Sequence, residues 1–202
     1  MHERTYRIIK GVAVLMVGAW IAWSLYDWLI AERHPYQREL SAAARYLEDG
    51  RPEDALTEYD GILNQDPGNA FALRGRAQSL LQLGRSDEAL GEYDRAIRRE
   101  HEAGIDEGNR TVLGVLYAQR GILKDRMGDY PGAVADYQQA MALEPETAEG
   151  PGWLTRFLRN QPDTPPTIAE RARYLRDQLA KPEDERLLRV PEQDTAQRSY
   201  TM

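Results

Sequence analysis

The chain has 202 residues, of which 42% are hydrophobic and 29% charged, so its composition is that of a folded protein rather than a disordered chain. It contains no cysteine, which excludes disulfides, thiolate metal sites and a cysteine nucleophile. The formal net charge is −7, and residues 35–202 carry −8 because residues 1–34 carry +1. A body of that sign disfavours binding to the phosphate backbone of nucleic acids.

An apolar segment lies near the start of the chain. Residues 11–26 contain no charged residue, and residues 8–30 form a stretch of twenty-three residues if Lys10 and Asp27 lie at the two membrane surfaces. That length matches a membrane-spanning helix, and no small-residue cleavage site of a signal peptide follows it. The sequence therefore predicts that residues 1–34 form an N-terminal tail and a single transmembrane anchor.

Basic residues set the expected orientation of this anchor. Three lie within fifteen residues of each end, but the N-terminal group is denser, which favours a cytoplasmic N-terminus and a periplasmic body. A body that faces the cytoplasm is the alternative. Gly18 and Ala22 form a small-xxx-small pair beside Trp20 and Trp23, so these four residues are expected to pack within the membrane. The other reading of the pair is that Gly and Ala are common in spanning helices.

A fixed spacing recurs in the rest of the chain. Gly50, Gly84 and Gly128 are each followed by an alanine five residues later and by a tyrosine four residues after that. The alanines are Ala55, Ala89 and Ala133, and the tyrosines are Tyr59, Tyr93 and Tyr137. Glycine permits the positive φ at which a helix stops, and small and aromatic residues at helical spacing form a buried stripe. Each copy therefore predicts a helical hairpin that must stack on its neighbours.

This pattern resembles the tetratricopeptide repeat, in three copies over about residues 36–147. The resemblance implies an all-α solenoid of helical hairpins over residues 35–147, with a concave face, formed by the first helices, that holds a peptide or helix. His101 stands where the second copy should have its closing proline, so that helix is expected to run on. Of the 26 basic residues 23 are arginine, a bias of GC-rich bacterial genes, so the chain is similar to a membrane-anchored bacterial member of this family.

Ten extra residues, 104–113, separate the second copy from the third. Gly104, Gly108 and Asn109 indicate a loop. Insertions in repeat arrays often form a binding edge, which would include Asp106, Val112 and Leu113. The alternative is a tolerated surface loop without a function, because loops accept extra length at little cost.

The register of the repeat places a mostly apolar set of side chains on the concave face. These are Leu40, Ala44, Leu47, Phe71, Arg74, Gln78, Leu81, Val115 and Ile122. Such a groove suits an amphipathic helix or an apolar segment, and the chain's own C-terminus is the other occupant to consider. Some members of the family clamp a C-terminal carboxylate with Lys and Asn, but Ala44 stands where that clamp would have Asn, so this mode is not expected.

Residues 148–202 are predicted to be a helical capping extension with a polar tail. Trp153, Leu154, Phe157 and Leu158 lie at helical spacing and are expected to cover the last hairpin. Thr167 and Glu170 form a capping box that predicts a helix start, and Pro182 begins a further short helix.

No phosphate-binding loop, zinc-binding motif or nucleophile elbow is present. The sequence therefore predicts no catalytic residue, metal, cofactor or small-molecule substrate, and a protein that is not an enzyme. We expect a scaffold in the bacterial inner membrane that binds membrane-borne or envelope proteins, contacts the bilayer through residues 8–30 and assists complex assembly. The alternatives are a permanent accessory subunit of a membrane complex and a chaperone-like binder of exported proteins.

Overall fold

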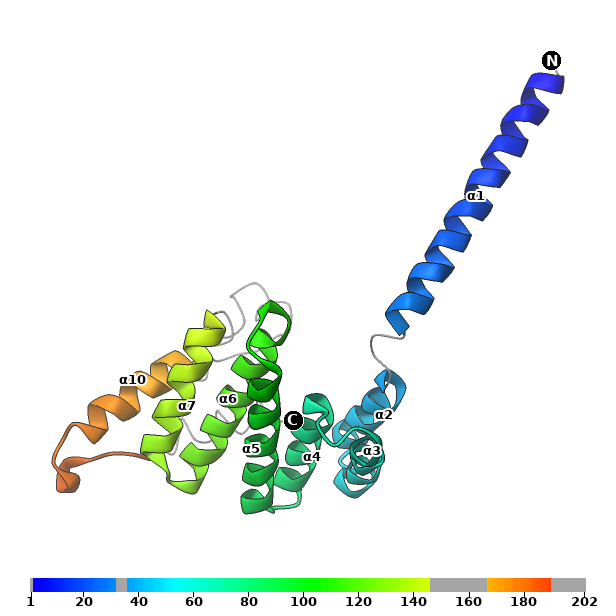
Figure 1. The fold of residues 1–202 in the computed structure, drawn as a ribbon. Coiled ribbons are helices and arrows are strands. Elements are labelled where there is room, and N and C mark those ends of the chain that lie inside the picture. The colour runs from blue at the N-terminus through cyan, green and yellow to red at the C-terminus, as the bar shows by residue number, and fades with distance from the viewer. Residues whose placement is uncertain (1, 32–35, 146–166, 190–202) are drawn as a thin grey trace. The chain divides into compact units, whose positions relative to one another are not determined.

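The computed structural model describes residues 2–31, 36–145 and 167–189. Within these residues all regular secondary structure is helical. The chain divides into two compact units, Met1–Arg38 and Glu39–Met202 (Figure 1). Both predicted domain boundaries, after residues 34 and 147, fall outside the described residues.

The first unit is dominated by a single long helix, α1 (His2–Ala31). Large apolar side chains in its middle are exposed, including Leu15, Trp20 and Trp23. A Cβ added at Gly18 would meet nothing within 4 Å. The four residues predicted to pack within a membrane therefore lie on α1 without a contact from the second unit in the described part of the chain.

The predicted transmembrane anchor is wrong. Among the described residues, no helix combines the length and the apolar character that crossing a membrane requires. The physical reason is that the uncharged run, residues 11–26, makes only about 24 Å of helix, against a hydrocarbon core of about 30 Å, and a longer span has to take in Lys10 and Asp27. The predicted contact of residues 8–30 with a bilayer, and the predicted inner-membrane location with a periplasmic body, fall with the anchor.

The second unit is an array of helical hairpins arranged in sequence order (Figure 1). Its helices are α2 (Gln37–Glu48), α3 (Pro52–Gln65), α4 (Ala70–Gln82), α5 (Ser86–Ala103), α6 (Glu107–Met127) and α7 (Tyr130–Leu143). The turns between the helices of each pair contain Gly50, Gly84 and Gly128, whose φ angles are 68°, 74° and 87°. These values confirm the role predicted for the repeated glycines.

The repeated alanines and tyrosines form the interior of the array, as predicted. Tyr59 on α3 packs against Gly75 on α4, and Tyr137 on α7 packs against Gly121 on α6, so each ring lies where a first helix has no side chain. A larger apolar cluster joins α4, α5 and α6, and includes Leu73, Leu80, Tyr93, Leu113 and Leu116. Neighbouring hairpins therefore share one hydrophobic core, which supplies most of the stabilisation of such arrays.

The second copy departs from the others at its end, as predicted. Helix α5 has 18 residues, four more than α3 or α7, and continues past His101. The loop predicted through Asn109 is shorter than expected, because Asp106 caps α6 and accepts hydrogen bonds from the backbone of Gly108 and Asn109. Only residues 104–106 connect the two helices, so most of the insertion extends α6 by more than a turn.

The C-terminal part of the array ends in a helix that packs on α7. Helix α10 (Ile168–Leu179) begins with the predicted capping box of Thr167 and Glu170, and the 3₁₀ helix η1 (Glu183–Glu185) follows Pro182. Ala172 and Leu175 of α10 form an apolar cluster with Ala133 and Tyr137 of α7. Helix α10 thus covers the last hairpin, whereas the covering helix predicted around Trp153 lies outside the described residues.

Candidate functional site

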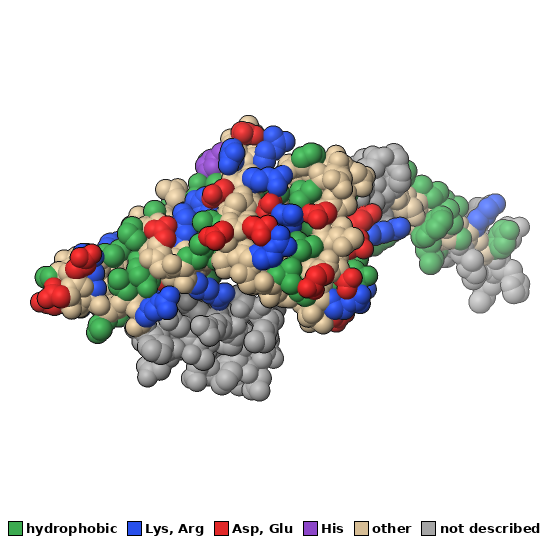
Figure 2. All heavy atoms as spheres, turned by 90° about the horizontal axis from the view of Figure 1, so that it is seen from below, with side chains coloured by type: hydrophobic (Ala, Val, Ile, Leu, Met, Phe, Trp, Pro, Cys, Tyr) green, Lys and Arg blue, Asp and Glu red, His purple; other side chains and the backbone are tan. Residues whose placement is uncertain are grey.

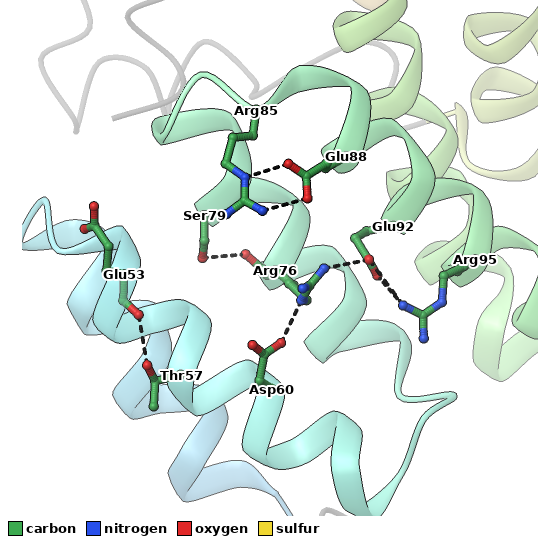
Figure 3. Close-up of polar contacts among 10 residues, drawn as sticks. Glu53, Thr57, Asp60, Arg76, Ser79, Arg85, Glu88, Glu92 and Arg95 are labelled. Atoms are coloured by element: carbon green, nitrogen blue, oxygen red, sulfur yellow. Dashed lines mark hydrogen bonds and ion pairs between the residues drawn. The ribbon is translucent and has the colours of Figure 1, made fainter.

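Helix α4 carries two half-buried arginines on opposite sides, because residues two positions apart on a helix differ by about 200° in direction. Arg76 bridges two neighbouring helices. Its guanidinium group donates to Asp60 on α3 at 2.7 Å and to Glu92 on α5 at 2.6 Å (Figure 3). Glu92 also accepts from Arg95. This side of α4 is therefore occupied by ion pairs between helices of the array.

Arg120 repeats the arrangement on α6. It donates to Asp94 on α5 at 2.7 Å and to Asp136 on α7 at 2.6 Å. Burial works against its charge, but the hydrogen bonds to Asp136 and Asp94 outweigh it, and the pKa of Arg120 lies above its usual value. We call Arg76 and Arg120 the bridging arginines, since each joins the second helix of one repeat to the second helix of the next.

The bridging arginines predict a moderate loss of stability on removal. Replacing Arg120 by alanine is expected to lower the free energy of unfolding by about 1–2 kcal/mol, because Asp136 would keep only Lys124 as a charged partner in a buried position. Urea unfolding measures the change. Arg98→Ala on the exposed surface of α5 is the control and should change the free energy of unfolding by less than about 0.5 kcal/mol. Equal losses for the two variants would contradict the structural role of the bridge.

The opposite side of the first helices carries the residues predicted to form the concave groove. Gln82 of α4 donates to the backbone oxygen of Leu47 on α2 at 3.3 Å, and α4 shares the main apolar cluster with α6, so these three helices lie alongside one another. We call this side the first-helix surface. Its residues are exposed or half-buried, and Phe71 is 46% exposed. They are Leu40, Ala44 and Leu47 on α2, Phe71, Arg74, Gln78 and Leu81 on α4, and Val115 and Ile122 on α6.

Two of the predicted groove residues are partly covered by the chain itself. Leu81 packs against the main apolar cluster. Ile122 packs against the cluster that α10 forms with α7. The C-terminal segment therefore covers one end of the first-helix surface, while Phe71 and its neighbours on α4 stay open to solvent. That the surface is a binding groove stays a prediction.

Arg74 is the polar centre of the open part of this surface. Its guanidinium carbon lies 5.7 Å from the centroid of the Phe71 ring, and its Nε is buried without a hydrogen-bond partner in the described residues. Burial raises the pKa of Tyr59 and Tyr93, and the positive charge of Arg74 works in the opposite direction on both. The guanidinium group therefore lies within electrostatic reach of both tyrosine hydroxyls.

The three residues of the predicted binding edge have different structural positions. Asp106 uses its carboxylate to cap α6, Val112 packs against the main apolar cluster, and Leu113 is fully buried in it. Leu113 therefore offers no surface to a partner, because it lies one turn inside the helix that the insertion extends. No cluster of metal-binding side chains occurs in the part of the chain that the structure describes.

Sequence reasoning missed the polar contacts that organise the array. The acidic partners of the bridging arginines directly follow or precede the repeated tyrosines, as Asp60 and Asp94 follow and Glu92 and Asp136 precede. This regularity was visible in the sequence. The partner of Arg171 was not, since Asp125 lies 46 residues away and no pattern connects the two.

Comparison with known proteins identifies the repeat. Residues 37–104 match the family model for the tetratricopeptide repeat. Over 115 residues the chain is 30% identical to the Tetratricopeptide repeat and J domain-containing co-chaperone DNJ1 of Fusarium oxysporum f. sp. lycopersici, which covers 57% of this chain and 20% of that protein. Over 132 residues it is 29% identical to Cellulose synthase operon protein C of Pseudomonas fluorescens, which covers 57% and 10%. The chain thus spans a fifth or less of the length of these curated relatives.

A solved structure shows the same fold. The first TPR domain of Spaghetti (RPAP3), bound to the HSP90 peptide SRMEEVD, matches with a TM-score of 0.52 and 19% identity, over 71% of this chain and 91% of that chain. At this identity the likeness concerns the fold alone. Together with the family match, it supports the assignment of the helical array to the tetratricopeptide repeat family, whose domains mediate protein–protein interactions.

Proposed function

Because residues 37–104 match the tetratricopeptide repeat, we propose that the array is a protein-binding scaffold whose first-helix surface holds a segment of a partner protein. The observation that carries the proposal is the contrast between the two sides of α4. One side is filled by the ion pairs of Arg76, and the other exposes Phe71 beside a half-buried Arg74. A half-exposed apolar surface with one polar centre is what a docked helix or extended segment uses.

The protein acts on its partners by binding and not by catalysis. Adapter function in the assembly of a protein complex fits a single small array best. The relative from Fusarium is named as a co-chaperone, which supports a chaperone-like binder of many clients as the second candidate. A permanent accessory subunit is the third. The three differ in how many partners contact the first-helix surface and in what ratio.

Site-specific photocrosslinking in the cells that produce the protein tests the proposal. A photoreactive phenylalanine analogue is placed at Gln78 on the first-helix surface and, as the matched control, at exposed Arg98 on α5. We expect protein adducts at position 78 that are absent at position 98 and that fall severalfold when Phe71 is also replaced by alanine. Equal labelling at both positions would remove the first-helix surface as the binding site.

The adducts also separate the candidates. One stoichiometric adduct indicates a permanent subunit, and a broad set of substoichiometric adducts indicates a chaperone-like binder. A small, defined set that appears only while a complex is being assembled indicates an adapter.

A further inference from the structure

Arg74 differs from the other arginines that are buried or half-buried in the described residues. Arg76 and Arg120 each have two carboxylate partners on neighbouring helices. Arg171 binds both oxygens of Asp125, and Arg186 lies 3.9 Å from Glu183. Arg74 has no carboxylate partner within the described part of the chain, and its contact there is with the Phe71 ring.

This difference is not explained by a shortage of acidic residues. The chain has a net charge of −7, and acidic and basic side chains are interspersed over the face of the array seen in Figure 2. The positions around Arg74 on the first-helix surface are instead neutral, with Ala44 on α2, Gln78 on α4 and Val115 on α6. Asp125, the acidic residue that the repeat register would place on this surface, is consumed by Arg171.

The positive potential at Arg74 is reinforced by a second guanidinium group. Burial raises the pKa of Tyr93, and the charges of both Arg74 on α4 and Arg126 on α6 act on its hydroxyl in the opposite direction. A half-buried cation that lacks a counter-charge is costly, and a carboxylate that reaches it forms a short, charge-assisted and often bidentate hydrogen bond. The surface is therefore complementary to an anionic group that arrives with an apolar neighbour.

We propose that Arg74 and Phe71 form a receptor for one acidic side chain, Asp or Glu, within an otherwise apolar segment of a partner protein. The proposal rests on the proposed function and names the chemistry of its partner. The carboxylate binds the guanidinium group of Arg74, and the adjacent apolar side chain covers the exposed ring of Phe71. Apolar positions continue on both sides of Arg74, with Leu40 and Leu47 on α2 and Val115 on α6. The bound segment therefore continues past Arg74 in both directions, which favours a side-chain carboxylate over a chain end.

A displayed peptide library tests this chemistry with the full-length chain. Each member is a twelve-residue segment with linkers at both ends, so that no terminal carboxylate is present, randomised over Ala, Leu, Phe, Ser, Gln, Glu and Lys. We expect binders that retain one Glu among apolar residues. Replacing that Glu by Gln should weaken the Kd for the wild-type chain about tenfold or more, as loss of a hydrogen bond between charged groups does.

Variants of the chain connect the preference to Arg74. In Arg74→Gln, the Glu and Gln peptides should bind within about twofold of each other, while the control Arg98→Gln should keep the full difference. Arg74→Lys should restore part of the preference, which separates loss of charge from loss of folding. Circular dichroism of each variant reports folding directly.

The outcomes distinguish this proposal from the proposed function. Binders that are lost in Phe71→Ala but show no preference for Glu overturn the acidic-side-chain receptor and leave the protein-binding scaffold intact. Binders that require a free terminal carboxylate, tested with synthetic peptides that end in an acid or an amide, also overturn the receptor as stated. Binders that are indifferent to Phe71→Ala overturn both.

Discussion

Replacing Arg171 by alanine is expected to lower the free energy of unfolding by about 3–5 kcal/mol, the cost of breaking a buried ion pair. Arg171 on α10 donates from Nε and Nη2 to the two carboxylate oxygens of Asp125 on α6 at 2.7 and 2.8 Å. The two side chains are only 2% and 4% exposed. Tyr137 also donates to Asp125, and Arg171 donates to the backbone oxygen of Leu188, so one substitution removes the centre of a buried network.

A double substitution is the matched control for this prediction. Leu47 and Leu81 stand in the first two repeats at the position that Asp125 holds in the third. Asp125→Leu together with Arg171→Met replaces the ion pair by apolar groups, and should recover most of the stability that Arg171→Ala loses, because no buried charge remains. Urea unfolding of the full chain, followed by circular dichroism, measures all three proteins. A loss in the double variant as large as that in Arg171→Ala would show that the pair itself stabilises the fold.

Replacing Gly75 by alanine is expected to lower the free energy of unfolding by about 2–3 kcal/mol, in spite of the better helix propensity of alanine. A Cβ at this position would overlap the ring of Tyr59, which packs on the backbone of α4. The ring is buried, so it can move only by displacing the apolar residues around it.

Gly91→Ala on α5 is the control for the effect of propensity alone. A Cβ at Gly91 would meet nothing within 4 Å, so this variant should be more stable by about 0.5–1 kcal/mol. Thermal and urea unfolding check both values. If Gly75→Ala also raised the stability, the close packing of Tyr59 on α4 would be wrong. Tyr59→Leu in the Gly75→Ala background should restore part of the loss by giving the new methyl group room.

The repeat made most of the fold predictable. The glycine, alanine and tyrosine positions report local needs, a positive φ, a close helix approach and a buried ring, and these needs are the same in each copy. The capping box at Thr167 was predictable for the same reason, because it satisfies helix-end groups within four residues. Features that depend on local sequence were therefore predicted well.

The misses concern interactions that no local pattern encodes. The long helix α1 was taken as a membrane anchor from its apolar composition, although its uncharged run is short and two charged residues bound it. The loop before α6 was drawn too long, because the capping action of Asp106 competes with the turn preference of Gly108 and Asn109. The groove residues were placed by register, and their role depends on what binds them, which no residue pattern states.

The bridging arginines have a consequence for how the array unfolds. Arg120 contacts the second helices of two repeats at once, and Arg76 does the same one repeat earlier. If one hairpin opened alone, the arginine of its neighbour would lose a carboxylate, and a buried acid would be left beside water that has just entered. The free energy of the array is thus concentrated at the joints between repeats rather than within them. Partial openings are rare in such a chain, and a partner meets a surface that is either fully formed or absent.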